Sequence, residues 1–377
     1  MSTWQDCKRI LCIRPDNIGD LLMSSPAIAA LKETFGAHIT LLTSTMAKGI
    51  APYLPAVDEI LTWDVPWVKG TSMTTERDFH RIVETLEKKN FDAAVIFTVF
   101  SQSALPTALM ATLARIPRRL AYCRENPYHL LSHWIPEKEP YSFVRHQVRR
   151  DLDLVATVGA RTQDERLRLQ VKVYPQESVR KKLLAAGVDI SMPWVIIHPG
   201  ASEKKRQYAA PLWIRAGTKI TRELGYQVIV TGTERERVTA ENIAGGIGAG
   251  SFSVAGKLSL EELITLIRFS PLLITVNTGP AHIAAAVETK VIVLYALTNP
   301  QHAPWKTVGK VLPFSVAEGL ESQNEILRFV HMKYYSRGRL MVEPDDIVVA
   351  AEDILVRKNE GVIDELVLPA RTGALTE

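Results

Sequence analysis

Short runs of apolar and β-branched residues alternate with amphipathic stretches along this 377-residue chain, and this alternation constrains its fold more than any other feature. Residues 9–14 (RILCIR) lead through a short loop into residues 21–35, whose apolar side chains recur at helical spacing. Further strand-like runs occupy residues 38–43, 59–62 and 92–98, and a helical pattern at 79–89 precedes the last of them. Apolar strands that alternate with helices predict a parallel sheet with helices on both faces.

The alternation restarts at residues 194–198 (WVIIH), which are followed by a polar loop and a helical pattern at 211–224. Further strands are expected at residues 226–231, 272–276 and 290–295. Two such series predict two doubly wound α/β domains. Pro175, Gly187 and Pro193 punctuate the segment between them, so we expect a boundary there. The expected parts are an N-terminal domain at 1–175, a linker at 176–192, a C-terminal domain at 193–343, and a terminal helix and tail at 344–377.

Composition excludes several classes of protein. The 45 Lys and Arg residues against 41 Asp and Glu residues give a net charge of +4, too small for a general nucleic-acid binder of this length. Three cysteines without CxxC spacing predict neither a disulfide framework nor a cysteine zinc site. The charged first residues do not resemble an export signal, and no apolar run approaches the roughly 18 residues of a membrane-spanning helix. We therefore expect a cytoplasmic protein that is at most peripherally attached to a membrane.

The first polar loop at the end of an expected strand is residues 14–20 (RPDNIGD). In parallel sheets, ligands bind beyond the carboxyl ends of the strands, where such loops lead into helices. Gly19 allows a close backbone approach, and Asp20 opens the next helix. Asp20 has two interpretations at this stage, as a helix cap or as a functional base.

Two further loops of this kind occur in the second half of the chain. Residues 198–208 contain small residues and then Lys204, Lys205 and Arg206, a pattern that suits a phosphate but also a solvated turn. Residues 276–282 (VNTGPAH) end a strand and begin an Ala-rich helix, where Thr278 can cap, Gly279 permits close approach and Pro280 suits the first turn. The N–H groups at such a helix start favour an anion. An isolated His282 would be interpreted as a core histidine bonded to the backbone.

Several other motifs are missing from the sequence. GxxxxGK[ST] and HExxH do not occur, and the glycines at 245–250 lack the dinucleotide-binding spacing. Asp151 and Asp153 form a DxD pattern, but their surroundings have helical periodicity, so we interpret them as surface charges on a helix. The sequence predicts no metal site and no cofactor.

Four sequence blocks, in this order, resemble glycosyltransferase family 9, the ADP-heptose:lipopolysaccharide heptosyltransferases. The blocks are RPDNIGDLLMSSPAIAALKETF, HPGASEKKRQY, TGTERERVTAENIA and VNTGPAHIAAAVETKVIVLYALTNP. The resemblance covers about residues 9–355. It implies a GT-B fold, in which two Rossmann-like doubly wound α/β domains face a central cleft, with the acceptor on the N-terminal side and the nucleotide-sugar on the C-terminal side.

The resemblance also implies roles for individual residues. Asp20 matches the family's catalytic aspartate, Lys205 the lysine near the donor diphosphate, and Glu236 the acidic residue near the donor nucleoside. The family's D-T-G-x-x-H motif corresponds to Asn277, Thr278, Gly279 and His282, so Asn277 replaces the usual aspartate. Gln207 and Tyr208 replace a usual Trp-Pro pair, and residues 318–342 have no clear counterpart.

Arginines are frequent in the N-terminal half, and their forked guanidinium groups suit carboxylates and phosphates. We expect an anionic acceptor there, bound by Arg14, Arg119, Arg124 and Arg145. The alternative is a solubilising surface.

Together these residues and the resemblance predict an inverting, metal-independent glycosyltransferase that moves heptose from ADP-heptose to an anionic saccharide, the lipopolysaccharide inner core. The expected location is the cytoplasm, either free or peripherally bound to the cytoplasmic face of the inner membrane. A second hypothesis keeps the family but changes the nucleotide-sugar, or uses a protein or small-molecule acceptor. A third is a non-transferring nucleotide-sugar binding protein or an epimerase on the same scaffold.

Overall fold

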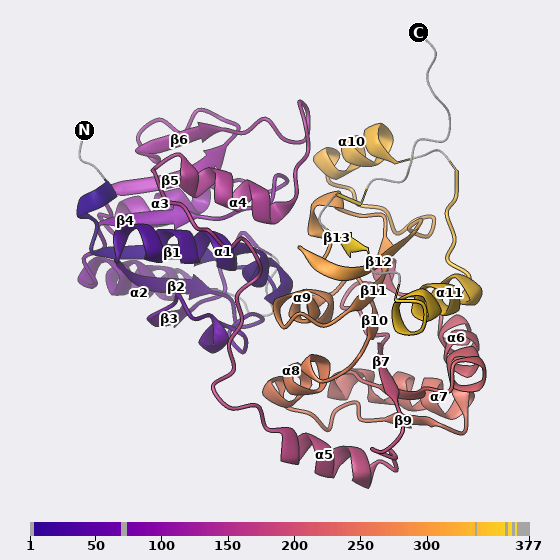
Figure 1. The fold of residues 1–377 in the computed structure, drawn as a ribbon. Helices are drawn as coiled ribbons and strands as arrows, with labels where there is room; N and C mark the ends of the chain where they lie inside the picture. Colours follow the sequence, from indigo (N-terminus) through magenta and orange to yellow (C-terminus); the bar gives the residue numbers. More distant parts are fainter. Residues whose placement is uncertain (1–3, 69–73, 336–337, 359–360, 364–365, 368–377) are drawn as a thin grey trace. The chain divides into compact units, whose positions relative to one another are not determined.

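The computed structural model describes residues 4–68, 74–335, 338–358, 361–363 and 366–367. The chain divides into two compact units, Met1–Gln170 and Val171–Glu377, and each contains its own sheet (Figure 1). Residues 176–192, which we expected as a linker, belong to the second unit. They include helix α5 (Gln176–Ala185), which buries Val179 and Leu183 and packs against a neighbouring helix of that unit.

The first unit is built on a six-stranded parallel sheet with the order β3-β2-β1-β4-β5-β6. The strands are β1 (Arg9–Arg14), β2 (His38–Thr43), β3 (Glu59–Thr62), β4 (Ala93–Ile96), β5 (Arg118–Cys123) and β6 (His133–Pro136). The chain runs outward from β1 to β3, returns to the middle at β4, and then runs outward to β6. The direction of winding therefore reverses between β1 and β4.

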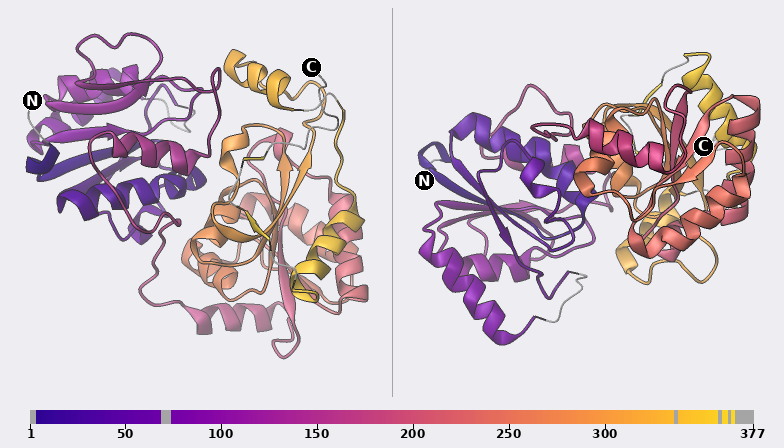
Figure 2. Two further views of the ribbon diagram at one scale, coloured as in Figure 1. Left: turned by 45° about the horizontal axis from the view of Figure 1, so that its top comes forward. Right: turned by 90° about the horizontal axis from the view of Figure 1, so that it is seen from below.

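Helices cover both faces of this sheet (Figure 2). On one face α1 (Ile18–Phe35) packs against α4 (Gln147–Ala156), and on the other α2 (Glu76–Lys88) packs against α3 (Leu105–Leu113). The strand residues Leu11, Ile13 and Ile96 share a buried cluster with Leu86 of α2 and Met110 of α3. Burial of both faces explains why the strands are almost continuously apolar rather than alternating.

The second unit has a seven-stranded sheet with the order β13-β12-β11-β10-β7-β8-β9. Its strands are β7 (Trp194–His198), β8 (Gln227–Val230), β9 (Ser251–Ser253), β10 (Leu273–Val276), β11 (Val291–Ala296), β12 (Thr307–Phe314) and β13 (Val362–Ile363). All pairs are parallel except the antiparallel edge pair of β12 and β13. The chain first runs outward from β7 to β9 and then returns to β10, so here the winding reverses between β7 and β10.

The helices of the second unit also lie on both faces of its sheet (Figure 1). One face carries α6 (Ala210–Glu223), α7 (Arg237–Ile247) and α11 (Pro344–Leu355), and the other carries α5, α8 (Leu260–Arg268) and α9 (Gly279–Ala286). Trp213, Ile220 and Ile347 of the first group share a core with Ile197 and Val228 of the sheet. A further helix, α10 (Glu325–Tyr334), follows β12 and lies within the stretch 318–342 that the family resemblance left without a counterpart.

The sequence-based expectation of two Rossmann-like α/β domains is confirmed. Strands form at every run that we expected, with bounds that differ by at most a few residues. Cys7, Cys12 and Cys123 are buried free thiols. Among the helices of the described residues, none combines the length and the apolar character needed to cross a bilayer. The last part of the expected tail lies outside the described residues.

Candidate functional site

The first candidate site is at the carboxyl edge of the first sheet, where the winding reverses between β1 and β4. Ligands of open α/β sheets bind in the crevice at such a reversal. The loop after β1 carries Asp16 and Asp20, and the loop after β4 carries Gln102, whose Nε2 donates to Asp16 Oδ1 at 2.7 Å. The two loops that flank the reversal are therefore joined by a direct hydrogen bond.

Arg14, the last residue of β1, is fully buried at this edge of the sheet. Its Nε is 3.1 Å from Asp16 Oδ2, and its Nη2 is 3.3 Å from Asp20 Oδ1. Burial acts to lower the pKa of Arg14, but the charges of Asp16, Asp20 and Asp151 outweigh it and raise the pKa. Burial raises the pKa of Asp16 despite the opposite charge of Arg14. The buried guanidinium of Arg14 thus holds the carboxylates of Asp16 and Asp20 together.

Asp20 occupies the first turn of α1. Its Oδ2 accepts a 3.3 Å hydrogen bond from the backbone N–H of the N-cap residue Asn17, so the cap interaction that we considered is present. Its other oxygen faces Arg14, and the side chain is 14% exposed. Capping and a reactive role are compatible here, because the carboxylate is fixed in place and still reaches solvent.

Our interpretation of Asp151 as a surface charge was wrong. Asp151 of α4 is buried, and its carboxylate accepts hydrogen bonds from Ser24 Oγ at 2.6 Å and from Gln147 Nε2 at 2.8 Å. The reason is that α4 packs this side against α1, which carries Ser24. Burial raises the pKa of Asp151 to about 6. Asp153 is different, because it is partly exposed and pairs with Arg145.

The other arginines that we expected at the acceptor make internal contacts. Arg124 follows β5 and donates to the backbone carbonyls of Phe100 and Glu139, at 3.1 and 2.7 Å. Arg145 pairs with Glu139 at 3.0 Å. Both therefore lie near the carboxyl edge of β4 to β6. Arg119 lies near the opposite end of β5, where it donates to the carbonyls of residues 129 and 130, so the structure does not bring it together with the other candidates.

The second candidate site lies at the equivalent reversal in the second sheet, between β7 and β10. The loop after β7 contains a short 3-10 helix, η3 (Lys204–Arg206), in which Lys204 is exposed whereas Lys205 and Arg206 are half-buried. Arg206 Nη1 donates to the backbone carbonyl of Asn277 at 3.2 Å and so ties this loop to the loop after β10. Lys205 Nζ is 3.4 Å from Glu203.

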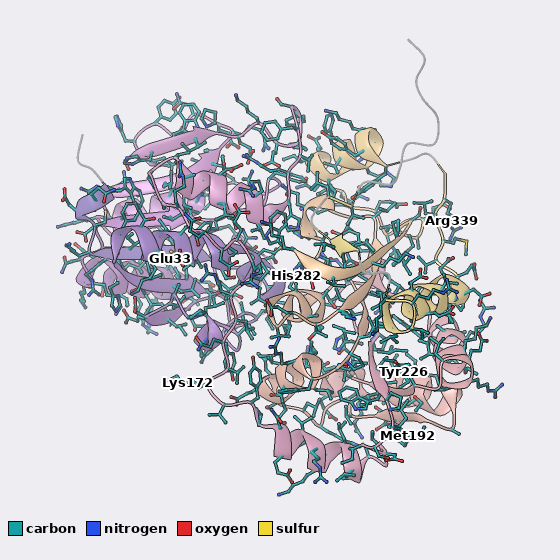
Figure 3. The ribbon with its side chains drawn as sticks, in the orientation of Figure 1. Glu33, Lys172, Met192, Tyr226, His282 and Arg339 are labelled. Carbon is teal, nitrogen blue, oxygen red and sulfur yellow. The ribbon has the colours of Figure 1, made fainter. Side chains whose placement is uncertain are left out.

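The loop after β10 presents the residues of the third sequence motif. Thr278 is the N-cap of α9 by position, but its hydroxyl donates back to the carbonyl of Val276 at 3.4 Å instead of capping the helix. Gly279 and Pro280 form the first turn, as we expected. His282 is buried within α9, where Figure 3 labels it.

Asn277 is buried and binds the neighbouring strand. Its Oδ1 accepts from the backbone N–H of Ala296 at 3.2 Å, and its Nδ2 approaches the carbonyl of Ala296 at 3.4 Å. Nδ2 also lies 3.5 Å from Thr298 Oγ1. A neutral amide suits this place because it can donate and accept at once, whereas a carboxylate can only accept.

Glu236 lies beyond β8 in the short helix η4 (Glu234–Glu236). Its Oε2 accepts from both the backbone N–H and the hydroxyl of Thr233, each at 2.8 Å. The same carboxylate packs against Gly200 of the loop after β7, where an added Cβ would lie only 2.3 Å from Glu236 Oε1. Gly200 therefore lets an acidic side chain approach the backbone beside the second reversal.

Next to Lys205 the second unit contains a cavity of about 370 Å³. Its walls are Lys205, Leu297, Thr298, Val316, Glu321, Ser322, Gln323, Leu327, Arg328, His331 and Met332. Apart from Lys205, sequence reasoning did not identify these residues. The only signal was that residues 318–342 matched nothing in the family pattern. Across the described ranges, the structure groups no three His, Cys, Asp or Glu side chains in a way that could hold a metal ion.

Two Rossmann-like units, each with polar loops at its winding reversal, are the architecture of the GT-B fold. The sequence profile of glycosyltransferase family 9 (heptosyltransferase) matches residues 79–321, well over half of the chain. The chain belongs to this family and is a glycosyltransferase.

Individual relatives agree with this assignment. The chain is 24% identical over 308 residues to lipopolysaccharide heptosyltransferase 2 of Salmonella typhimurium, covering 78% of this chain and 85% of the relative. A family 9 glycosyl transferase structure from Veillonella parvula matches with a TM-score of 0.72 at 14% identity, covering 93% and 97% of the two chains. The structure of ADP-heptose lps heptosyltransferase II from E. coli matches with a TM-score of 0.67 at 19% identity, covering 93% and 99%.

Proposed function

We propose that the protein transfers heptose from ADP-heptose to an anionic saccharide, the lipopolysaccharide inner core, with inversion at the anomeric carbon and without a metal ion. One observation carries this proposal: Lys205 follows β7, and the Asn277 to Gly279 loop and Glu236 follow its two neighbours in the second sheet, β10 and β8. The names of the relatives supply the donor and acceptor that this proposal adopts.

In this proposal the second unit holds the donor. Lys205 and the first turn of α9 act on the diphosphate, because a cation and a helix N-terminus both favour phosphate oxygens. Arg206 keeps the Lys205 loop beside the Asn277 loop. Glu236 faces the ribose hydroxyls, as a carboxylate that accepts hydrogen bonds.

The first unit supplies the base and holds the acceptor. Asp20 takes the proton of the acceptor hydroxyl while the hydroxyl oxygen bonds to the anomeric carbon of heptose. The bond from that carbon to the diphosphate oxygen breaks, and ADP leaves with the electron pair. Lys205 neutralises the charge that develops on ADP. Arg124 and Arg145 are half-buried near the carboxyl edge of the sheet that also carries Asp20, where an anionic acceptor would meet them. Arg14, which we expected at the acceptor, is fully buried and orients Asp20 instead.

A transfer assay tests the proposal. Purified protein is incubated with ADP-heptose, with and without lipopolysaccharide inner-core acceptor, and the released ADP is measured. We expect release that requires the acceptor and persists in EDTA. Release without acceptor would indicate hydrolysis or epimerisation, and a need for a divalent ion would overturn the role given to Lys205. If another nucleotide-sugar is used instead, the second hypothesis, favoured by the unusual Asn277 and α10, is correct.

A matched pair of lysine variants tests the donor site. Lys205→Ala should weaken ADP binding by roughly ten- to a hundredfold, since a charge-assisted contact contributes about 1.5–3 kcal/mol. Lys204→Ala removes the same charge from an exposed neighbour that does not line the cavity and should leave binding unchanged. Calorimetric titration with ADP measures both, and equal effects of the two variants would reject the specific role of Lys205.

A further inference from the structure

The cavity beside Lys205 lies on one side of the proposed diphosphate site. Along the sheet, β8 precedes β7 and β10, and β11 and β12 follow. Glu236 follows β8, Lys205 follows β7 and the Asn277 loop follows β10, whereas the cavity is lined by Leu297 and Thr298 after β11 and by Val316 after β12. With neighbouring strands about 4.8 Å apart, β8 and β11 are separated by roughly 14 Å. A donor whose nucleoside lies at β8 and whose diphosphate lies at the reversal therefore has its sugar at β11 and β12.

Helix α10 forms the outer wall of this cavity and is fixed at both ends. Its N-cap Asn324 accepts hydrogen bonds from the backbone N–H groups of residues 326 and 327, at 3.0 and 3.2 Å. Just beyond its last turn, the buried Tyr335 donates its hydroxyl to the carbonyl of Thr298 at 2.9 Å. The His331 ring packs edge-on against Tyr335, with the centroids 5.5 Å apart. The wall is thus attached to the loop after β11, which itself lines the cavity.

The lining combines apolar surface with hydrogen-bonding groups. Four side chains are apolar, and the rest carry a hydroxyl, an amide, an imidazole or a charge. A few polar groups among apolar walls, in a volume within the 300–1,000 Å³ range, are typical of small-ligand sites. Glu321 in the lining disfavours a second phosphate, whereas sugar hydroxyls can donate to a carboxylate and accept from a guanidinium.

Arg328 is the side chain of α10 best placed to act on a ligand. It lines the cavity, and its guanidinium makes no ion pair with any carboxylate in the described part of the chain. It also lies outside residues 79–321, which match the family. A residue beyond the shared region can distinguish the substrate of this chain from those of its relatives.

We propose that the cavity is the subsite for the transferred glycosyl group, and that Arg328 and Gln323 are specificity-determining residues that bind its hydroxyls. This proposal rests on the proposed function, because it takes the position of the diphosphate from there. Arg328 acts on the sugar of the donor and not on the nucleoside diphosphate.

Calorimetric titration with two probes, ADP and ADP-heptose, tests this assignment. Arg328→Gln should weaken ADP-heptose binding by about tenfold, the effect of losing one charge-assisted hydrogen bond, and should change ADP binding by less than about twofold. Lys333→Gln removes the same charge from α10 at a position that does not line the cavity, and should change neither. Gln323→Ala provides an independent second variant with the same expected selectivity.

The outcomes are distinguishable from a failure of the proposed function. Equal loss of ADP and ADP-heptose binding would place Arg328 at the diphosphate and overturn the assignment, as would unchanged binding of both by the Arg328 and Gln323 variants. If the wild-type protein binds another nucleotide-sugar but not ADP-heptose, the donor is wrong, and the same comparison is made with that nucleotide-sugar and its nucleoside diphosphate. If it binds none, both proposals fail.

Discussion

At the scale of single residues, the Asp20 carboxylate accepts a hydrogen bond from the N–H of the N-cap residue Asn17 and is also the proposed catalytic base. We expect Asp20→Asn to lower turnover by at least about 10²-fold, because an amide cannot accept the proton of the acceptor hydroxyl. ADP affinity should stay the same, since the donor residues belong to the second unit. Initial rates at saturating ADP-heptose, together with ADP titration, measure the two effects.

Thermal melting of the same variant separates the two interpretations of Asp20. An asparagine oxygen can still accept from the N–H of Asn17, so the helix cap should survive and stability should fall by no more than about 1 kcal/mol. Near-normal turnover with a large loss of stability would show that Asp20 is a cap and not the base.

Asp151 makes a pH-dependent contribution to stability. Its pKa rises to about 6 in the folded protein because of burial, so the folded state binds this proton more tightly than the unfolded state. The contribution is complete below about pH 4 and is lost as the pH rises through about 6, by about 1 kcal/mol between pH 5 and pH 7.5. His198, whose pKa is lowered by burial, acts in the opposite direction.

Asp151→Asn should remove this part of the pH dependence. Urea denaturation of wild type and variant at pH 5 and pH 7.5 gives the difference, in which His198 and Asp16 cancel because both proteins contain them. An identical change of unfolding free energy in the two proteins would contradict a buried carboxyl group that titrates near pH 6.

At the scale of elements, Asn277 links β10 to β11. We expect Asn277→Asp to lower the unfolding free energy by about 1–3 kcal/mol, because a carboxylate beside the carbonyl of Ala296 cannot donate to it. ADP affinity should change little, since Lys205 is retained. Urea unfolding and ADP titration test this. Unchanged stability with an altered preference among nucleotide-sugars would show instead that Asn277 faces the sugar.

The sequence predicted the elements well where both faces of a strand are buried. The strands β1, β7 and β11 were recognisable because short continuous apolar runs are typical of parallel strands that are covered on both faces. Strands β5, β6, β9, β12 and β13 were missed. β5 begins with two arginines, β12 is interrupted by Gly309, Lys310 and Pro313, and the other three are edge strands of two to four residues. Helix α10 was missed because Val330 is its one buried residue, so its sequence shows no wide apolar stripe.

The site was predictable only as far as it depends on local sequence. The loops after β1, β7 and β10 were identified from strand ends, glycines and charges. The cavity was not, because it combines Lys205 of the loop after β7 with side chains from residues 297–332, a distant part of the chain. Asp151 shows the same limit, since a helical pattern does not reveal which neighbouring helix covers a carboxylate.

At the scale of the whole molecule, each unit has its own sheet and its own buried core. In both units the polar loops of interest lie at the reversal of winding, after strands at the centre of the sheet. Both units therefore place charged side chains after their central strands. The first unit has carboxylates around Arg14, and the second has the cationic loop at Lys205.

This organisation predicts that residues 171–377 fold alone and bind ADP with an affinity within about threefold of the full chain. A unit of about 200 residues with a complete sheet is large enough to bury a stable core, and it contains every residue assigned to the donor. The fragment should show no transfer, because it lacks Asp20. Circular dichroism, cooperative urea unfolding and ADP titration test these expectations, with Lys205→Ala in the fragment as the control for specific binding. A folded fragment that binds ADP more than about thirtyfold more weakly would mean that the first unit contributes to the donor site. A fragment that does not unfold cooperatively would mean that the two cores depend on each other.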